Sequence, residues 1–226
     1  KDVPSELPEG LQITAICERE DPRDAFVSVN FQRLDDLPEG ARIGSSSLRR
    51  RIQLQQKYPR YRFIELRGNV DTRLKKLENQ VAEATFLAMA GLKRLNMDEV
   101  PRQAIEVDDM LPAVAQGAIG IERRINDGRM ADMLAAIHDR ETGQRLAAER
   151  AFLAALDGSC ETPIAGLSEL QGSTMRLRGE VLRPDGSDAI HDDMVVPIED
   201  GAQAGKEMAA KLLEQAGRGF FDWRES

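Results

Sequence analysis

Residues 41–96 alternate three short apolar runs with three polar runs that have a helical period. The apolar runs are ARIGSS, YRFIELRG and ATFLAMAG, and the runs that follow them are SLRRRIQLQQKYP, VDTRLKKLENQ and LKRLNM. The third apolar run has almost no polar residue, as is typical of a strand buried on both faces of a parallel sheet. Three strand–helix units in so short a stretch predict an α/β fold with right-handed crossovers.

The C-terminal part of the chain has a different pattern. Three β-type runs, LSEL, TMRLRGEVLRP and DAIHDDMVVPI, are joined by the turn sequences QGS and PDGS. Short turns between alternating runs predict an antiparallel sheet of three strands. The helical run at 201–216 is expected to cover one face of that sheet, which makes this part an α+β domain.

Two further strands are expected outside these units, around residues 10–17 and 117–122. Neither belongs to the α/β part, at about 20–110, or to the α+β part, at about 140–226. The chain opens on KDVPSELPEG without an initiator methionine. We therefore expect these two strands to pair with a segment upstream of residue 1, and a chain that ended there to be poorly stable and weakly active.

The distribution of charge is uneven. The formal net charge is −8, yet residues 42–76 contain eleven Lys or Arg against Glu65 and Asp71, which gives +9 there and −17 in the remainder. A basic island in an acidic protein indicates a focused anionic ligand. A nucleic-acid surface is disfavoured by an aromatic content of 4% and by the acidic remainder.

Serine and arginine residues follow the ends of the three predicted strands of the α/β part. They are Ser45, Ser46, Ser47, Arg49, Arg50, Arg67, Arg73 and Arg94. Ligands of open parallel sheets bind beyond the carboxyl ends of the strands, where helix N-termini converge. Arginine suits bidentate recognition of carboxylate or phosphate, so a small, multiply charged anion is predicted. The other basic residues of this segment are expected on solvated helix faces.

The two cysteines require separate interpretations. Cys17 lies inside an apolar strand and is expected to be structural, whereas Cys160 lies in the loop LDGSCETPIAG. Neither His138 nor His191 belongs to a cysteine-protease signature, so Cys160 is interpreted as an attachment point rather than a hydrolytic nucleophile. No zinc-site spacing is present, and no metal is expected. Asp2, in KDVP, indicates on its own only a turn.

The sequence contains no apolar run near the roughly 18 residues that cross a bilayer. It has no signal-peptide pattern either. These observations favour a reducing, cytoplasmic location and no membrane partner.

Seven motifs, in order and in spacing, resemble those of the porphobilinogen deaminase (hydroxymethylbilane synthase) family. They are KDVP, EREDPRDAF, IGSSSLRR, LRGNVDTRLKKL, LAMAGLKRL, LPAVAQGAIGIE and LDGSCETPIAG. The resemblance implies two parallel-sheet domains like those of periplasmic binding proteins and a C-terminal α+β domain. It divides this chain into a remnant of domain 1 at 1–19 and 115–135, domain 2 at 20–114 and domain 3 at 136–226.

The resemblance also implies an activity and a set of site residues. Four porphobilinogen units are condensed on a dipyrromethane cofactor, held as a thioether by Cys160, with release of ammonia and hydroxymethylbilane. Asp2 matches the catalytic aspartate, which would stabilise positive charge on the pyrrole nitrogens, and a monomer is implied. The implied cofactor contacts are Lys1, Ser47, Arg49, Arg50, Arg73 and Gln116, and the implied substrate-carboxylate contacts are Arg67 and Arg94.

Two other functions remain as alternatives. A non-catalytic module that binds polycarboxylate anions could have the same fold, but it would leave Cys160 and Asp2 without a role. A nucleic-acid-binding protein could use the segment of charge +9, and salt-dependent binding to random DNA would support it.

Overall fold

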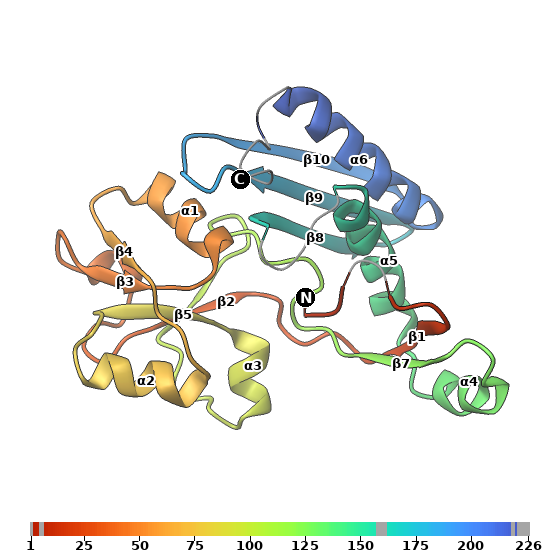
Figure 1. Ribbon diagram of the computed structural model, residues 1–226, viewed down its shortest axis with the longest axis horizontal. Coiled ribbons are helices and arrows are strands. Elements are labelled where there is room, and N and C mark those ends of the chain that lie inside the picture. The colour runs from red at the N-terminus through yellow and green to blue at the C-terminus, as the bar shows by residue number, and fades with distance from the viewer. Residues whose placement is uncertain (1, 5–6, 157–161, 218–219, 221–226) are drawn as a thin grey trace.

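The computed structural model describes the chain except residues 1, 5–6, 157–161, 218–219 and 221–226. The described residues form a five-stranded, a three-stranded and a two-stranded sheet. Figure 1 shows the five-stranded sheet with α1, α2 and α3 on one side of the molecule and the three-stranded sheet with α5 and α6 on the other. The two-stranded sheet lies beside α4, and the crossing segments run between these parts.

The five-stranded sheet contains the three predicted strand–helix units and two strands that were not predicted. Its strands are β2 (Asp24–Val27), β3 (Arg42–Gly44), β4 (Arg62–Ile64), β5 (Ala84–Ala88) and β6 (Gln103–Ile105), and its helices are α1 (Leu48–Lys57), α2 (Val70–Glu78) and α3 (Met89–Arg94). The order is β4-β3-β5-β2-β6. Strand β3 is parallel to β4 and β5, whereas β2 runs antiparallel to β5 and β6. The expectation of a parallel sheet therefore holds for three strands, and the whole sheet is mixed.

Each face of this sheet is buried by alternate residues of its strands. On β2, Phe26 packs into the cluster that contains Ile43, Leu54 and Phe86. The neighbouring residues of β2, Ala25 and Val27, pack on the opposite face with Leu77 of α2 and Leu92 of α3. Because side chains alternate along a strand, burial on both faces explains the continuously apolar strand sequences.

The C-terminal part has the predicted α+β architecture. Its elements are α5 (Arg140–Ala155), β8 (Ile164–Gln171), β9 (Thr174–Leu182), β10 (Ala189–Pro197) and α6 (Gly201–Ala216), with a short 3₁₀ helix at Ile198–Asp200 before α6. Another short 3₁₀ helix, at Leu34–Asp36, belongs to the part with the five-stranded sheet. The sheet is antiparallel throughout, in the order β10-β9-β8. Helices α5 and α6 cover one face (Figure 1), and the other face is turned toward α1.

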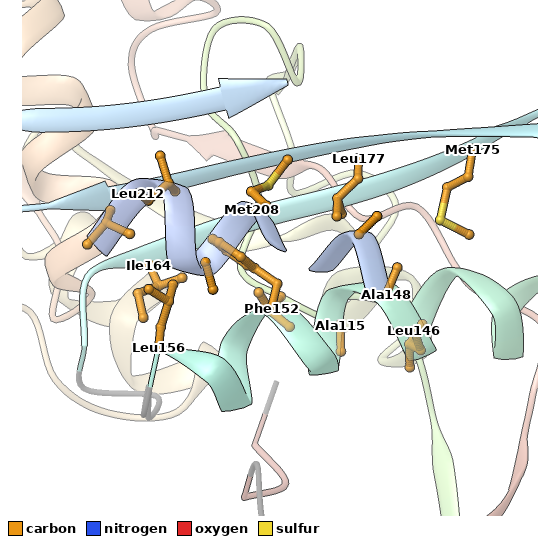
Figure 2. Packing of buried hydrophobic residues seen from close by; sticks show 14 of the residues in the cluster. Ala115, Leu146, Ala148, Phe152, Leu156, Ile164, Met175, Leu177, Met208 and Leu212 are labelled. Atoms are coloured by element: carbon orange, nitrogen blue, oxygen red, sulfur yellow. The ribbon is translucent and has the colours of Figure 1, made fainter. Parts of the chain in front are cut away.

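The core of this part is a helix–helix–sheet contact. Figure 2 shows Phe152 of α5 and Met208 of α6 meeting beneath the strands, with Leu177 of β9 nearby. Gly179 leaves the space for them, because a Cβ there would lie 2.6 Å from Met208 Sδ and 2.7 Å from Phe152 Cζ. Gly205 allows the two helices to approach, since its Cβ would lie 2.3 Å from the carbonyl oxygen of Ala148.

The two remaining strands pair with each other, and the expected pairing with a segment upstream of residue 1 stays a prediction. Strand β1 (Leu11–Ile16) runs antiparallel to β7 (Gly120–Arg124), with an irregularity between Ile13 and Ala15, and α4 (Gly128–Ala135) follows β7. Backbone hydrogen bonds extend this pairing into the crossing segments, from Cys17 N to Ile119 O at 3.0 Å and from Glu20 N to Gly117 O at 3.0 Å.

The crossing segments approach each other at Gly117. Its φ is +88°, and a Cβ would lie 2.4 Å from the carbonyl oxygen of Glu20, so both its conformation and its contact require glycine.

Among the described helices, none has the length and apolar character needed to cross a membrane.

Candidate functional site

A cavity of about 250 Å³ lies where α1, the N-terminal segment, the crossing segment after β6, α5 and the start of β8 meet. It is lined by Asp2, Ser46, Ser47, Arg49, Arg50, Arg73, Ala113, Val114, Gln116, Leu153, Thr162 and Ile164. Seven residues singled out from the sequence are therefore brought together here: Asp2, Ser46, Ser47, Arg49, Arg50, Arg73 and Gln116. Lys1 and Cys160 lie outside the described residues. The N-terminal segment is held against α5 by a hydrogen bond of 2.8 Å from Arg150 Nη2 to Pro4 O.

The serines at the end of β3 form the start of α1. Ser47 is the N-cap residue, and its hydroxyl accepts from Arg50 N at 3.5 Å. Ser45 Oγ accepts in turn from Ser47 N at 3.2 Å. A helix N-terminus favours an anion, and the first turn of α1 carries no acidic residue. This end of the cavity is therefore suited to a carboxylate.

Arg49 and Arg50 of α1 are not free side chains, because both pair with Asp24 at the start of β2. Arg49 Nη2 donates to Asp24 Oδ2 at 2.7 Å, and Arg50 donates to Asp24 Oδ1 from Nη2 at 2.7 Å and from Nε at 2.9 Å. The other end of each guanidinium donates to a backbone carbonyl oxygen, that of Leu111 for Arg49 and that of Phe86 for Arg50. Asp24 is fully buried.

The charges of this cluster do not cancel. Burial alone would raise the pKa of Asp24, but the charges and hydrogen bonds of Arg49 and Arg50 outweigh it and hold this pKa well below its usual range. Burial lowers the pKa of Arg49, an effect that Asp24 opposes. Two guanidinium groups and one carboxylate leave one net positive charge at the cavity, together with N–H groups that the internal bonds do not use.

Gln116 lines the cavity and carries a buried acceptor without a partner in the described part of the chain. Its Nε2 donates to Pro22 O at 2.7 Å and to Asp24 Oδ1 at 2.9 Å. Both partners are acceptors, so the amide nitrogen must face them and the amide oxygen must face away. Among the described residues, Gln116 Oε1 has no hydrogen-bond partner, although the side chain is almost fully buried. A buried acceptor of this kind calls for a donor from a ligand or water.

Arg73 is the cation of this cavity with the fewest competing contacts. Its Nε donates to Gly68 O at 2.8 Å and its Nη2 to Ser46 Oγ at 3.1 Å. No carboxylate of the described chain lies within ion-pair distance of it. Burial, and then the charge of Arg50, lower its pKa, so an arriving anion would be favoured here.

Two of the arginines that the sequence singled out lie at neighbouring hollows. Arg67 is largely exposed, pairs with Glu65 at 2.6 Å, and lines a hollow of about 420 Å³ beside Ser45, Ser46 and Ser47. Arg94, in the last turn of α3, lines a third hollow of about 550 Å³. Asp2 and Gln116 line that hollow as well as the first cavity, so these two residues stand between the two spaces.

Two family models and a curated relative match this chain, and all three are of the same family. Residues 1–132 match the family described as "Porphobilinogen deaminase, dipyromethane cofactor binding domain", and residues 144–214 match "Porphobilinogen deaminase, C-terminal domain". A porphobilinogen deaminase of Paracoccus denitrificans (strain Pd 1222) is 60% identical over 223 residues, which is 99% of this chain and 71% of that protein. The class is that of a transferase acting on a small pyrrole substrate. The chain belongs to the porphobilinogen deaminase family.

Solved structures show a weaker likeness. A methionine-binding lipoprotein of Bacillus subtilis, described as putative, aligns with a TM-score of 0.40 and 12% identity over 59% of this chain and 63% of its own. A periplasmic binding protein of Salmonella typhimurium aligns with a TM-score of 0.35 and 16% identity over 57% and 62%. This chain thus spans less than two thirds of either protein, and family membership follows from the sequence matches alone.

Family membership gives the reaction. The chain is a hydroxymethylbilane synthase of tetrapyrrole and heme biosynthesis, which condenses four porphobilinogen units on a dipyrromethane primer with release of ammonia. The alternative of a non-catalytic anion-binding module has no support among these findings. Within the described part of the chain, no group of three or more His, Cys, Asp or Glu side chains could hold a metal ion.

Proposed function

We propose that the cavity lined by Asp2, Arg49, Arg50, Arg73 and Gln116 is where this chain holds the dipyrromethane and carries out the condensation. The observation that carries the proposal is the pairing of excess positive charge with an unused buried acceptor in one space. A dipyrromethane presents carboxylates and pyrrole N–H groups, so its two kinds of polar group match the two kinds of protein group. The residues at the cavity therefore fit this cofactor.

The residues have distinct proposed roles. Arg49, Arg50 and Arg73 bind the cofactor carboxylates, with Ser47 at the N-terminus of α1. Gln116 Oε1 accepts from a pyrrole N–H. Lys1 and the thioether residue Cys160 complete the set from outside the described residues. When bound, the dipyrromethane supplies the pyrrole to which the first substrate unit is added.

Asp2 is proposed as the catalytic carboxylate. Loss of ammonia from porphobilinogen leaves an electron-deficient ring, and positive charge develops at its nitrogen. A fixed carboxylate beside that N–H stabilises the charge and can move the proton. Asp2 lines both the first cavity and the hollow of Arg94. This placement supports a substrate site in which Arg94 binds a carboxylate of the incoming unit. Arg67 is proposed as the second carboxylate contact from the sequence resemblance, although it lines a different hollow.

The test of this proposal is Asp2→Asn, which keeps the shape of the side chain and removes its charge. Turnover of porphobilinogen should be nearly abolished, while the thermal unfolding curve and the mass of the Cys160 peptide with two linked pyrrole units stay as in the unchanged protein. Glu9→Gln, an exposed carboxylate in the same segment, is the matched control and should keep full activity. An unchanged rate in Asp2→Asn would show that the assignment is wrong.

The domain division and the location are also proposed. Residues 1–19 with 115–135, 20–114 and 136–226 are proposed as the three units, which is supported by the three separate sheets. A cytoplasmic location is proposed because thioether formation at Cys160 requires a free thiol, which a reducing compartment maintains. Cell fractionation with an antibody to the chain tests the location.

A further inference from the structure

One buried carboxylate contacts three of the side chains that line the first cavity, although it does not line the cavity itself. Asp24 accepts from Arg49 Nη2 at 2.7 Å, from Arg50 Nη2 at 2.7 Å and from Gln116 Nε2 at 2.9 Å. These donors come from α1 and from the crossing segment after β6, while Asp24 belongs to β2. The carboxylate thus joins two parts of the cavity wall to β2, which lies between β5 and β6 of the five-stranded sheet.

We propose that Asp24 is the positioning residue of this cavity: it sets the directions of Arg49 and Arg50 and the orientation of the Gln116 amide. The proposal rests on the proposed function of the cavity. Arginine side chains have many rotamers, and a carboxylate that accepts from both removes most of that freedom before a ligand arrives. It also separates two like charges that would otherwise repel each other across the cavity wall.

The orientation of the Gln116 amide also depends on Asp24. An amide can turn by 180° and exchange its oxygen and nitrogen. Asp24 Oδ1 and Pro22 O both accept from Nε2, so the turned amide would place its oxygen against two acceptors. The charge on Asp24 makes this arrangement the more unfavourable of the two. Asp24 therefore keeps Gln116 Oε1 turned away from these two acceptors, where it has no partner among the described residues.

A purely structural ion pair offers a matched comparison. Arg19 and Glu149 are as deeply buried as the Asp24 cluster, and Glu149 accepts from Arg19 and from the backbone of Ala115. Neither of these two side chains lines the first cavity. Loss of either carboxylate should lower stability, but only loss of Asp24 should change how the cavity binds its ligand.

The experiment compares Asp24→Asn with Glu149→Gln. Three quantities are measured for each: the urea midpoint, the fraction of purified chain that carries the dipyrromethane by intact mass, and the KM and kcat for porphobilinogen of the loaded fraction. We expect both variants to lose stability. Only Asp24→Asn should lose at least tenfold in loaded fraction or gain at least tenfold in KM. Equal loading and KM in the two variants would overturn the proposal.

A second variant covers the case in which Asp24→Asn does not fold. Asp24→Glu keeps the charge and moves the carboxylate oxygens by one methylene, and Glu149→Asp is its counterpart. The proposal requires Asp24→Glu to load less cofactor than Glu149→Asp when their urea midpoints match, and equal loading would contradict it. The same assay on Arg73→Met distinguishes failure of the proposed cofactor cavity from failure of the role proposed for Asp24. If Arg73→Met and Asp24→Asn both load normally, the proposed cavity is wrong, whereas normal loading of Asp24→Asn alone refutes only the role of Asp24.

Discussion

Arg19 and Glu149 form a two-bond ion pair, with Nη1–Oε1 at 2.6 Å and Nη2–Oε2 at 3.1 Å, and their side chains are 3% and 0% exposed. The same carboxylate accepts from Ala115 N at 2.7 Å and from Ser168 N at 2.9 Å. The pair therefore joins both crossing segments to α5 and β8. Both carboxylate oxygens of Glu149 accept hydrogen bonds, so removal of one partner of the ion pair would leave buried groups unsatisfied.

Arg19→Met should destabilise the protein by about 3–5 kcal/mol, because Glu149 would remain as a buried charge without its cation. The double variant Arg19→Met/Glu149→Gln should recover part of this loss. The measurement is urea unfolding followed by circular dichroism. Arg67→Met removes a largely exposed pair with Glu65 and should cost at most about 1 kcal/mol. A cost of that size for Arg19→Met would contradict the structural role given to the pair.

Glu180 should make stability depend on pH in the direction opposite to a paired carboxylate. Burial raises its pKa from 4.5 to about 7, against a smaller lowering effect of Arg49. Its Oε2 is buried without a partner among the described residues. The folded carboxyl binds its proton more tightly than the unfolded one, so its contribution to stability is complete below about pH 4.5 and is lost as the pH rises through about 7.

The variant Glu180→Gln should therefore be more stable than the unchanged protein at pH 8, by up to about 3 kcal/mol, and equal to it near pH 4. Urea unfolding at the two pH values measures this difference. Glu207→Gln, on the exposed face of α6, is the control and should leave the pH dependence unchanged. Equal stabilities of Glu180→Gln and the unchanged protein at pH 8 would argue against a neutral Glu180.

Gly205→Ala should destabilise the C-terminal core by at least about 2 kcal/mol. The added Cβ would lie 2.3 Å from Ala148 O and 2.9 Å from Phe152 N, and both are backbone atoms that cannot turn away. Gly128→Ala in α4 meets nothing within 4 Å and should be neutral or stabilise the helix by up to about 1 kcal/mol. Thermal unfolding of the two variants gives the comparison, and similar melting temperatures would contradict the close packing of α5 and α6.

Arg73→Met should raise the KM for porphobilinogen, or lower cofactor loading, at least tenfold with little change in stability. The reason is that its guanidinium forms two hydrogen bonds, to Gly68 O and Ser46 Oγ, and no ion pair within the described chain. Lys75→Met, on an exposed position of α2, is the control for loss of one positive charge. Steady-state kinetics and intact mass measure both effects, and identical behaviour of the two variants would speak against Arg73 as an anion contact.

The long elements and the short strands that precede a helix were predictable, whereas the isolated short strands were not. Helix α6 has the bounds 201–216 that its sequence indicates, because Ala, Lys, Glu and Leu favour a helix there. Strands β2 and β6 have four and three residues, too few for an alternation to be recognised. The pairing of β1 with β7 joins segments more than a hundred residues apart, and no local pattern encodes it.

The candidate site was predictable in its ligand-facing residues but not in its internal partners. The strand ends placed Ser47, Arg49 and Arg50 at one rim, and these residues do line one cavity. Asp24 and Glu149 were missed because each stands in a sequence that suits a solvated side chain. Their burial depends on Arg50 and Arg19, which lie 26 and 130 positions away. Contacts between residues so far apart in the sequence can be recognised only in the folded structure.

The crossing segments between the two larger sheets are held by buried hydrogen bonds on both sides, which restricts how the sheets can move apart. On one side, Asp24 of β2 accepts a hydrogen bond from Gln116. On the other side, Glu149 of α5 accepts hydrogen bonds from Arg19 and from the backbone of Ala115. To swing the sheets apart at this point, the molecule would have to separate the buried Arg19–Glu149 pair and the hydrogen bond between Gln116 and Asp24. These contacts hold the two sheets together at this point, so we expect room for a lengthening pyrrole chain to come from rearrangement of the cavity wall.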